Sequence, residues 1–208
     1  MPGPYQRFGK RGLDLVLAGT ATVVLAPAML PLALAVWRQL GRPVLFVQRR
    51  PGRNGRLFPL LKLRTMNDAR DHDGRLRPDA ERLGPLGRVL RRYALDELPS
   101  LLNVLRGDMS LVGPRPLLPE YLPCYSPREA QRHRVRPGLT GWAQVHGRNA
   151  VSWDERLSLD VWYVEHVSLA LDVRILVRTV GVVLRGRGAQ APGHATMPRL
   201  DHVRGPRR

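Results

Sequence analysis

The sequence predicts an α+β fold that is rich in helix and begins with a membrane-associated helix. Three observations indicate this fold class: a long apolar run at residues 13–37, two strand-like runs on either side of a turn, and helical spacing of apolar residues in the later segments. The expected domains are a membrane-associated helix (1–38), a cytoplasmic domain (39–185) and a disordered basic tail (186–208).

The composition favours anionic partners and a reducing compartment. The chain has 208 residues, with 34 Lys and Arg against 17 Asp and Glu, a formal charge of +17. Such a balance points to lipid headgroups, nucleotides or nucleic acid. The single cysteine excludes an internal disulfide, and the six histidines do not pair with cysteines as in a zinc site. A cytoplasmic setting fits these counts.

The apolar run has two alternative interpretations. No charged residue occurs between Leu15 and Trp37, so a straight helix of this run would be about 35 Å long, enough to span a bilayer. Pro27 and Pro31 each remove a backbone donor near its middle, which favours a kink or a break. Basic residues flank both ends, so the positive-inside rule assigns both ends to the cytoplasmic face. These residues leave open a re-entrant helix and a kinked single-pass anchor.

The segments after residue 40 predict a hairpin followed by helices. Residues 44–50 and 57–65 flank the turn PGRNG and are expected to pair as strands. A helix is expected over residues 98–105, with Asp96 at or near its N-cap and Gly107 as its stop. Ser152 and Glu155 form a capping-box pattern for a helix that continues through Tyr163.

The last predicted helix, residues 172–185, carries three arginines in a narrow stripe, with Val, Ile and Leu around most of its remaining circumference. This pattern fits either a core helix with one wet edge or an amphipathic helix on an anionic membrane surface. Beyond Gly186 the chain is rich in Gly, Pro, Arg and His without apolar periodicity, which predicts a disordered tail.

Three segments are candidates for chemistry on phosphate groups. Asp96 and Glu97 are adjacent carboxylates in an arginine-rich region, where one could be a nucleophile and the other could hold a divalent cation. Arg115 lies between two prolines in GPRP, which suits bidentate binding of a phosphate. The glycine-rich segment 136–149 contains Arg136 and Arg148 and could close over a nucleotide or sugar. Each segment also has a structural interpretation, as a helix start, a rigid turn or a loop.

The ordinary nucleotide-binding motifs are absent from the sequence, since it contains neither G-x-x-x-x-G-K-[ST] nor G-x-G-x-x-G. Instead, the order of several motifs resembles the bacterial sugar transferase family, the monotopic phosphoglycosyl transferases. The resemblance covers residues 5–185 and rests on the following segments: KRGLDLVLA, FVQRRPGRNGRLFPLLKLRTM, ALDELPSLLNVLRGDMSLVGPRPLLPEY and RPGLTGWAQVHGRN.

The resemblance implies an enzyme that moves a sugar 1-phosphate from a UDP-sugar to polyprenyl (undecaprenyl) phosphate and releases UMP, in the first membrane step of glycan assembly. It implies that Asp96 is the nucleophile and forms a covalent phosphosugar intermediate, and that Glu97 helps to position Mg²⁺. Lys62, Arg91 and Arg115 match basic positions expected to meet phosphate. Arg136 and Arg148 are the remaining expected substrate-binding residues.

The resemblance also implies a re-entrant helix that breaks at Pro27, with the enzyme monotopic in the cytoplasmic membrane and facing the cytoplasm. Here Ala26 precedes the proline, where the family commonly has Ser, and His146 replaces a more usual Asn. The segment GRNAVSW resembles members that act on UDP-N-acetylated amino or deoxy sugars. The alternatives are a UDP-glucose or UDP-galactose donor, and a non-catalytic basic module that binds membranes. Nucleic acid is not an expected partner of the enzyme.

Overall fold

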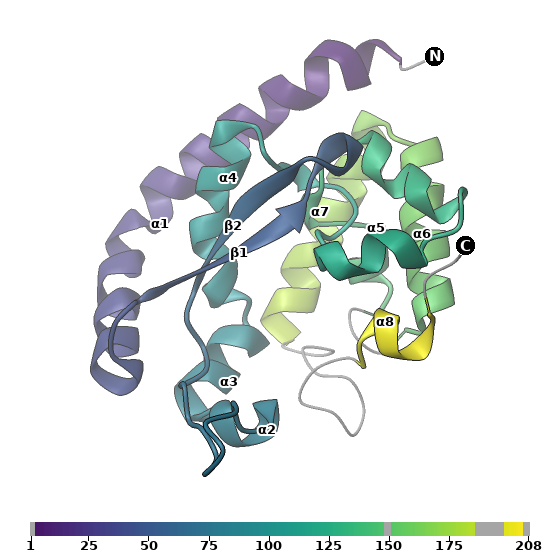
Figure 1. Cartoon of the computed structure of the whole chain (residues 1–208). Coiled ribbons are helices and arrows are strands. Elements are labelled where there is room, and N and C mark those ends of the chain that lie inside the picture. Colours follow the sequence, from purple (N-terminus) through teal and green to yellow (C-terminus); the bar gives the residue numbers. More distant parts are fainter. Residues whose placement is uncertain (1–2, 148–150, 186–197, 206–208) are drawn as a thin grey trace.

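The computed structural model describes residues 3–147, 151–185 and 198–205. The N-terminal helix α1 runs along one side of a mixed α and β body (Figure 1). The described helices and strands are α1 (Lys10–Leu40), β1 (Leu45–Pro51), β2 (Leu57–Leu63), α2 (Asp79–Arg82), α3 (Pro85–Arg92), α4 (Leu101–Arg106), β3 (Ser110–Val112), β4 (Gly138–Thr140), α5 (Trp142–Val145), α6 (Trp153–Glu165), α7 (Leu169–Arg185) and α8 (Leu200–Val203).

The predicted hairpin is confirmed. Strands β1 and β2 pair antiparallel, with Leu45 opposite Leu63 and Pro51 opposite Leu57. Because side chains alternate between the faces of a strand, the even-numbered residues of both strands share one face. Phe58 and Leu60 on this face are buried, which fixes the hairpin against the body.

A second sheet joins β3 and β4 in parallel, with Ser110 opposite Gly138 and Val112 opposite Thr140. Sequence analysis did not predict these three-residue strands, because they are too short to show periodicity. This pairing places residues 138–140 beside residues 110–112, which directly precede GPRP.

Two of the predicted helix boundaries are confirmed and one is wrong. Gly107 ends α4 in the left-handed conformation at φ 92°, and the Ser152 hydroxyl accepts a hydrogen bond from the Glu155 backbone N–H at the start of α6. Asp96, however, is not an N-cap. It lies inside a 3₁₀ turn (Leu95–Ser100) that precedes α4; the N-cap of this turn is Ala94 and the N-cap of α4 is Ser100. The tertiary fold therefore places the carboxylate within the turn, where it does not cap the helix.

Helix α1 continues through both of its prolines. The expected break at Pro27 does not occur: α1 is one helix of 31 residues that contains Pro27 and Pro31. It curves along the body in Figure 1. A proline removes one hydrogen bond and pushes away the carbonyl four residues earlier, which a curved helix accommodates without unwinding.

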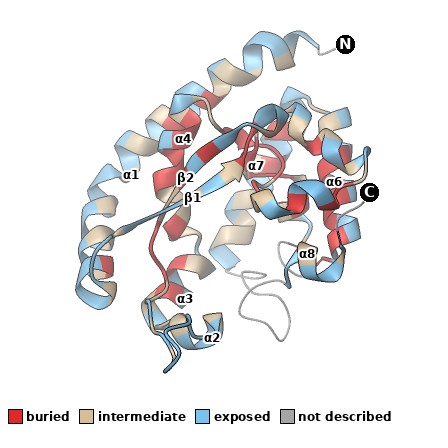
Figure 2. Cartoon of the chain, in the orientation of Figure 1, coloured by how far each residue is buried: buried red, intermediate tan, exposed pale blue. Residues whose placement is uncertain are grey.

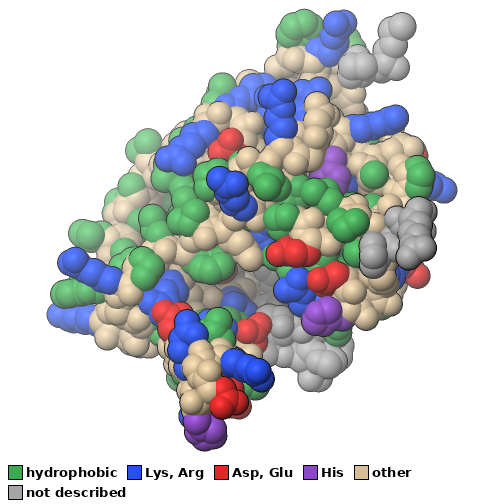
Figure 3. All heavy atoms as spheres, in the orientation of Figure 1, with side chains coloured by type: hydrophobic (Ala, Val, Ile, Leu, Met, Phe, Trp, Pro, Cys, Tyr) green, Lys and Arg blue, Asp and Glu red, His purple; other side chains and the backbone are tan. Residues whose placement is uncertain are grey.

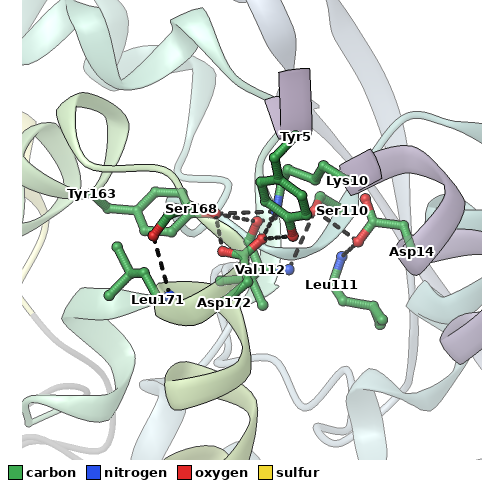
Figure 4. Close-up of polar contacts among 10 residues, drawn as sticks. All are labelled: Tyr5, Lys10, Asp14, Ser110, Leu111, Val112, Tyr163, Ser168, Leu171 and Asp172. Carbon is green, nitrogen blue, oxygen red and sulfur yellow. Dashed lines mark hydrogen bonds and ion pairs between the residues drawn. The ribbon is translucent and has the colours of Figure 1, made fainter. Parts of the chain in front are cut away.

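The N-terminal end of α1 is attached to the body by a buried polar cluster (Figure 4). Asp172 of α7 accepts hydrogen bonds from Tyr5 (2.6 Å), Lys10 (2.6 Å) and Tyr163 (2.7 Å). One turn further on, the buried Asp14 carboxylate accepts hydrogen bonds from the Ser110 hydroxyl and the Leu111 N–H, each at 3.0 Å. These contacts join α1, α6, α7 and β3.

The C-terminal end of α1 packs on the same body. Val36 is fully buried and contacts a cluster with Leu63 and Leu90, from β2 and α3. The outward face stays exposed, as the pale blue of α1 in Figure 2 shows. Exposed apolar residues recur there at intervals of seven: Val16, Val23, Leu30 and Trp37. Of the described helices, only the N-terminal one is long and apolar enough to cross a membrane.

The last helix has a buried face, as its core alternative predicted, and an exposed apolar face. Leu171, Asp172 and Ile175 of α7 are buried in the body. On its other side, α7 exposes Val177 and Leu184. One face of α7 is therefore part of the core, whereas the opposite face exposes apolar side chains.

Part of the predicted disordered tail is ordered. Residues 186–197 and 206–208 lie outside the described residues, but residues 198–205 are described and include α8. Leu200 is fully buried beside Trp153 and Leu157. A short segment with one buried apolar residue has no periodicity, so its docking on the body could not be predicted from the sequence.

Candidate active site

A cavity of about 750 Å³ opens between the hairpin, the segment around Asp96, the GPRP loop and α6. Its lining carries eight basic and five acidic side chains. The charged residues in the lining are Arg50, Lys62, Arg64, Asp68, Asp79, Arg82, Arg91, Asp96, Glu97, Arg115, Arg156, Asp160 and Arg199. This excess of positive charge favours an anionic ligand.

Asp96 is held at the cavity by a tight turn. Ala94 has a left-handed backbone with φ 54°, which a residue with a Cβ seldom adopts. This conformation turns the chain from α3 into the 3₁₀ segment that carries Asp96. The carboxylate is buried, and no group in the described part of the chain donates a hydrogen bond to it. Burial raises the pKa of Asp96, although Lys62 acts in the opposite direction.

Glu97 has the opposite environment, although it is the next residue. Its carboxylate accepts hydrogen bonds from Lys62 Nζ at 2.7 Å and from Arg115 Nη2 at 2.5 Å. Burial alone would raise the pKa of Glu97, but Arg115 and Lys62 outweigh it and hold the pKa well below its ordinary value. Glu97 is therefore ionised, and it fixes two cations beside Asp96.

The three basic residues predicted from the resemblance all line the cavity. Glu97 raises the pKa of Arg115, while burial lowers the pKa of Lys62. The Arg91 Nε donates to the Thr65 hydroxyl at 3.0 Å, which orients its guanidinium. A phosphate in the cavity would meet cations that are already positioned by protein groups.

The hairpin supplies a cation that sequence analysis missed. Gln48 and Arg50 of β1 share the face of Leu60 and Lys62 in β2, and all four line the cavity. Arg50 Nη2 donates to the Gln48 amide oxygen at 2.6 Å, and burial, with the nearby Arg115, lowers the pKa of Arg50 to about 10. The alternation of the strand could have identified Arg50 once Lys62 was chosen, because the register places both on one face.

A buried ion pair between Arg132 and Asp160 contacts the GPRP loop through the Arg115 carbonyl. The Arg132 side chain donates to Asp160 Oδ2 through Nε (3.2 Å) and Nη2 (2.7 Å), and both side chains are 1% exposed. The same Nη2 also donates to the Arg115 carbonyl at 2.7 Å. Sequence analysis missed this pair, because its members are 28 residues apart and no local pattern joins them.

Two of the predicted substrate-binding residues are not brought into the described cavity. Arg136 does not line it; its Nε donates to the Gly107 carbonyl at 2.8 Å, at the end of α4. Arg136 therefore acts as a cap for α4 carbonyls. Arg148 lies outside the described residues.

The carboxylates of the cavity fit Mg²⁺ only if a phosphate completes its coordination. Within residues 3–147, 151–185 and 198–205, there is no group of three or more His, Cys, Asp or Glu side chains that could hold a metal ion. Asp96 and Glu97 are hard oxygen donors, and Mg²⁺ is often bound by one or two carboxylates together with substrate phosphates and water. The donor set is thus compatible with Mg²⁺ that arrives with a phosphorylated ligand.

Together these features make the cavity a candidate site for an enzyme that acts on a phosphorylated substrate. A carboxylate without a hydrogen-bond donor in the described chain lines a cavity that also contains cations bound by Glu97. An unpaired carboxylate can attack phosphorus only if such cations screen the approaching negative charges.

Comparison with known proteins agrees with this class. The model of the bacterial sugar transferase family matches residues 5–186. The chain is 50% identical over 191 residues to the sugar transferase EpsL of Bacillus subtilis, covering 92% of this chain and 95% of EpsL. It is 44% identical to the UDP-glucose:undecaprenyl-phosphate glucose-1-phosphate transferase of Caulobacter vibrioides, covering 88% of this chain and 73% of that protein.

A third relative is much longer than this chain. The UDP-N-acetylgalactosamine-undecaprenyl-phosphate N-acetylgalactosaminephosphotransferase of Aeromonas hydrophila is 38% identical over 198 residues, which cover 91% of this chain but 47% of that protein. The protein belongs to the bacterial sugar transferase family.

Proposed function

We propose that this enzyme transfers a sugar 1-phosphate from a UDP-sugar to undecaprenyl phosphate through a phosphosugar intermediate on Asp96. The observation that carries the proposal is the contrast between two neighbouring carboxylates in one basic cavity. Asp96 has no hydrogen-bond donor in the described chain, while Glu97 is bound by Lys62 and Arg115. One carboxylate is left to react and the other organises the cations.

In the first step, a carboxylate oxygen of Asp96 attacks the phosphorus that bears the sugar. An O–P bond forms, the P–O bond to the nucleotide breaks, and UMP leaves with the bonding electrons. In the second step, a phosphate oxygen of undecaprenyl phosphate attacks the same phosphorus and the aspartyl O–P bond breaks, which regenerates Asp96. Neither step requires a protein proton donor, since both leaving groups are anions that are stable near neutral pH.

The basic residues of the cavity would stabilise the negative charge of the phosphate groups during both steps. Lys62 and Arg115, fixed by Glu97, would hold the oxygens of the attacked phosphate, and Arg91 is positioned near Asp96 by Thr65. Mg²⁺, held by Glu97 together with the donor phosphates, would supply further neutralisation of the diphosphate.

The sugar is proposed to be an N-acetylated amino or deoxy sugar, with glucose or galactose as the alternative. The Aeromonas relative is named for N-acetylgalactosamine and the Caulobacter relative for glucose, so related chains handle both classes.

The assay that tests this function is UMP release by the detergent-purified protein with Mg²⁺ and undecaprenyl phosphate, over a panel of UDP-sugars. We expect UMP from one or two donors, together with a lipid-linked sugar phosphate and loss of both products when Mg²⁺ is chelated. Absence of UMP with every N-acetylated and hexose donor, from a protein that remains folded, would refute the proposal.

The enzyme is further proposed to be monotopic, with α1, curved but unbroken, inserted into the membrane from the cytoplasmic face so that both of its ends lie on that face. A helix that spans the bilayer separates its ends by a hydrocarbon core of about 30 Å. Here both ends of α1 pack on one body, through Asp14 on β3 and Val36 on β2 and α3. In Figure 3, apolar side chains recur along the side of the molecule on which α1 runs, with Lys and Arg side chains toward both of its ends.

Cysteine labelling tests this topology. The only cysteine, Cys124, is buried, and a Cys124→Ser background removes any labelling of this residue. Gly3→Cys and Gln39→Cys, both at exposed positions near the two ends of α1, should react with a membrane-impermeant maleimide in inside-out vesicles and not in intact cells. Labelling of the two positions from opposite sides would establish a spanning helix.

A further inference from the structure

The wall of the active-site cavity is completed by a segment beyond the family match. The match ends at residue 186, yet Arg199 lines the same cavity as Asp96 and Glu97. The residues that carry the proposed reaction all lie within 5–186. The C-terminal segment 198–204 therefore contributes something that is additional to the shared machinery.

Several contacts hold this segment in place. The Trp153 indole N–H donates to the Pro198 carbonyl at 2.9 Å, and Leu200 is fully buried against the cluster around Trp153. Arg204 donates to Glu129 at 2.8 Å. The two hydrogen bonds come from different elements, α6 and the 3₁₀ turn that begins at Glu129, and they hold the segment near both of its ends.

These contacts place one cation at the cavity. The Arg199 side chain is 43% exposed, and its Nε and Nη2 donate to Asp201 at 3.0 and 2.8 Å. Asp201 does not line the cavity. Arg199 thus lines the cavity, while Asp201, which is outside the lining, binds the Nε and Nη2 edge of its guanidinium. An arginine so oriented can bind a phosphate bidentately with its remaining N–H groups.

The position of Arg199 indicates which anion it meets. The charged and polar groups that act on Arg199 are Asp201, Tyr121 and Glu120, whereas Lys62 and Arg115 surround Asp96. Figure 1 shows α8 on the far side of the body from α1, and α1 is the one described helix that is long and apolar enough to cross a membrane. If the lipid-borne phosphate approaches the cavity from the side of α1, the soluble substrate is the one that Arg199 can meet.

We propose that Arg199 binds the nucleoside monophosphate half of the sugar donor, the half that leaves when Asp96 attacks. The C-terminal segment is then a donor-specific wall of the active site. This inference rests on the proposed function, because it identifies Arg199 as a binding residue for the same reaction.

The test compares Arg199→Ala with wild type in steady-state kinetics and in UMP binding. Loss of a hydrogen bond to a charged group weakens binding by roughly ten-fold or more. We expect the KM for the UDP-sugar and the inhibition constant of UMP to rise together by about this factor, with kcat and the KM for undecaprenyl phosphate unchanged. The matched control is Arg128→Ala, an exposed arginine outside the cavity, which should leave all four constants unchanged.

Asp201→Asn separates ligand binding from a structural role of the Arg199–Asp201 pair. If the pair merely holds α8, removal of either partner should raise the donor KM equally. If Arg199 binds the nucleotide, loss of the competing carboxylate leaves the donor KM unchanged or lowers it. Equal increases in both variants would overturn the inference, as would an unchanged UMP constant in Arg199→Ala. Either result can be obtained with a fully active wild type, so it leaves the proposed function intact.

Discussion

Asp96→Asn is expected to lower kcat by about 10³-fold or more, because loss of a covalent nucleophile removes the reaction path itself. Asn has nearly the same shape and cannot donate an electron pair from a carboxylate oxygen. Intact-mass measurement after incubation with donor alone should show an added sugar phosphate on wild type and none on the variant. The control is Asp73→Asn, in an exposed loop, which should retain full activity and the adduct.

The same substitution should not destabilise the fold. Burial raises the pKa of Asp96, so its ionised form is less favourable in the folded than in the unfolded chain. At a pH above the pKa that Asp96 has in the unfolded chain, the charged carboxylate therefore lowers the free energy of unfolding. Removal of the charge should leave the melting temperature equal or higher. A variant that is inactive because it unfolds would contradict this account.

The raised pKa of Asp96 also sets the expected pH dependence. The nucleophile must be ionised, so the burst of UMP in the absence of acceptor should fall as the pH decreases through the pKa of Asp96. Because that pKa is raised, the acid limb should lie above the ordinary aspartate range. An acid limb at or below that range would mean that another group, or none, controls this step.

Asp160→Asn is expected to lower the free energy of unfolding by about 3–5 kcal/mol. The substitution leaves the Arg132 guanidinium buried without its counter-charge, since both side chains are 1% exposed. Although burial raises the pKa of Asp160, Asp160 in turn holds the pKa of Arg132 above its ordinary value despite burial, so the loss of Asp160 leaves a buried charged guanidinium without the group that stabilises it. Denaturant unfolding of the solubilised protein measures the loss, with Asp73→Asn again as the unaffected control.

A double substitution separates stability from the positioning of the loop. Arg132→Met with Asp160→Leu removes both charges, and apolar replacements of a buried pair often restore stability. The Arg115 carbonyl would still lose the hydrogen bond from Arg132 that holds GPRP. We expect near wild-type stability with a raised KM for the donor. A stable double variant with unchanged kinetics would show that the pair does not position Arg115.

The sequence alone determined the elements whose signals are local. Alternation and the PGRNG turn predicted β1 and β2, Gly107 predicted the end of α4, and Ser152 predicted the start of α6. The order of motifs predicted the family, and the three basic residues that it implied at the cavity, Lys62, Arg91 and Arg115, do line it.

The tertiary structure decided which charges share the cavity. Arg50 enters it through strand register, Arg199 through a segment that showed no periodicity, and Arg136 is directed instead to the end of α4.

The structure also decided that α1 curves through Pro27 without breaking, because both of its ends are held on one body by Asp14 and Val36. Local patterns report backbone preference and burial, whereas the partner of a charge depends on contacts between residues far apart in the chain. Asp96 and Glu97 illustrate this difference: they are neighbours in sequence, and only the fold gives one of them two cations and leaves the other carboxylate without a hydrogen-bond donor in the described chain.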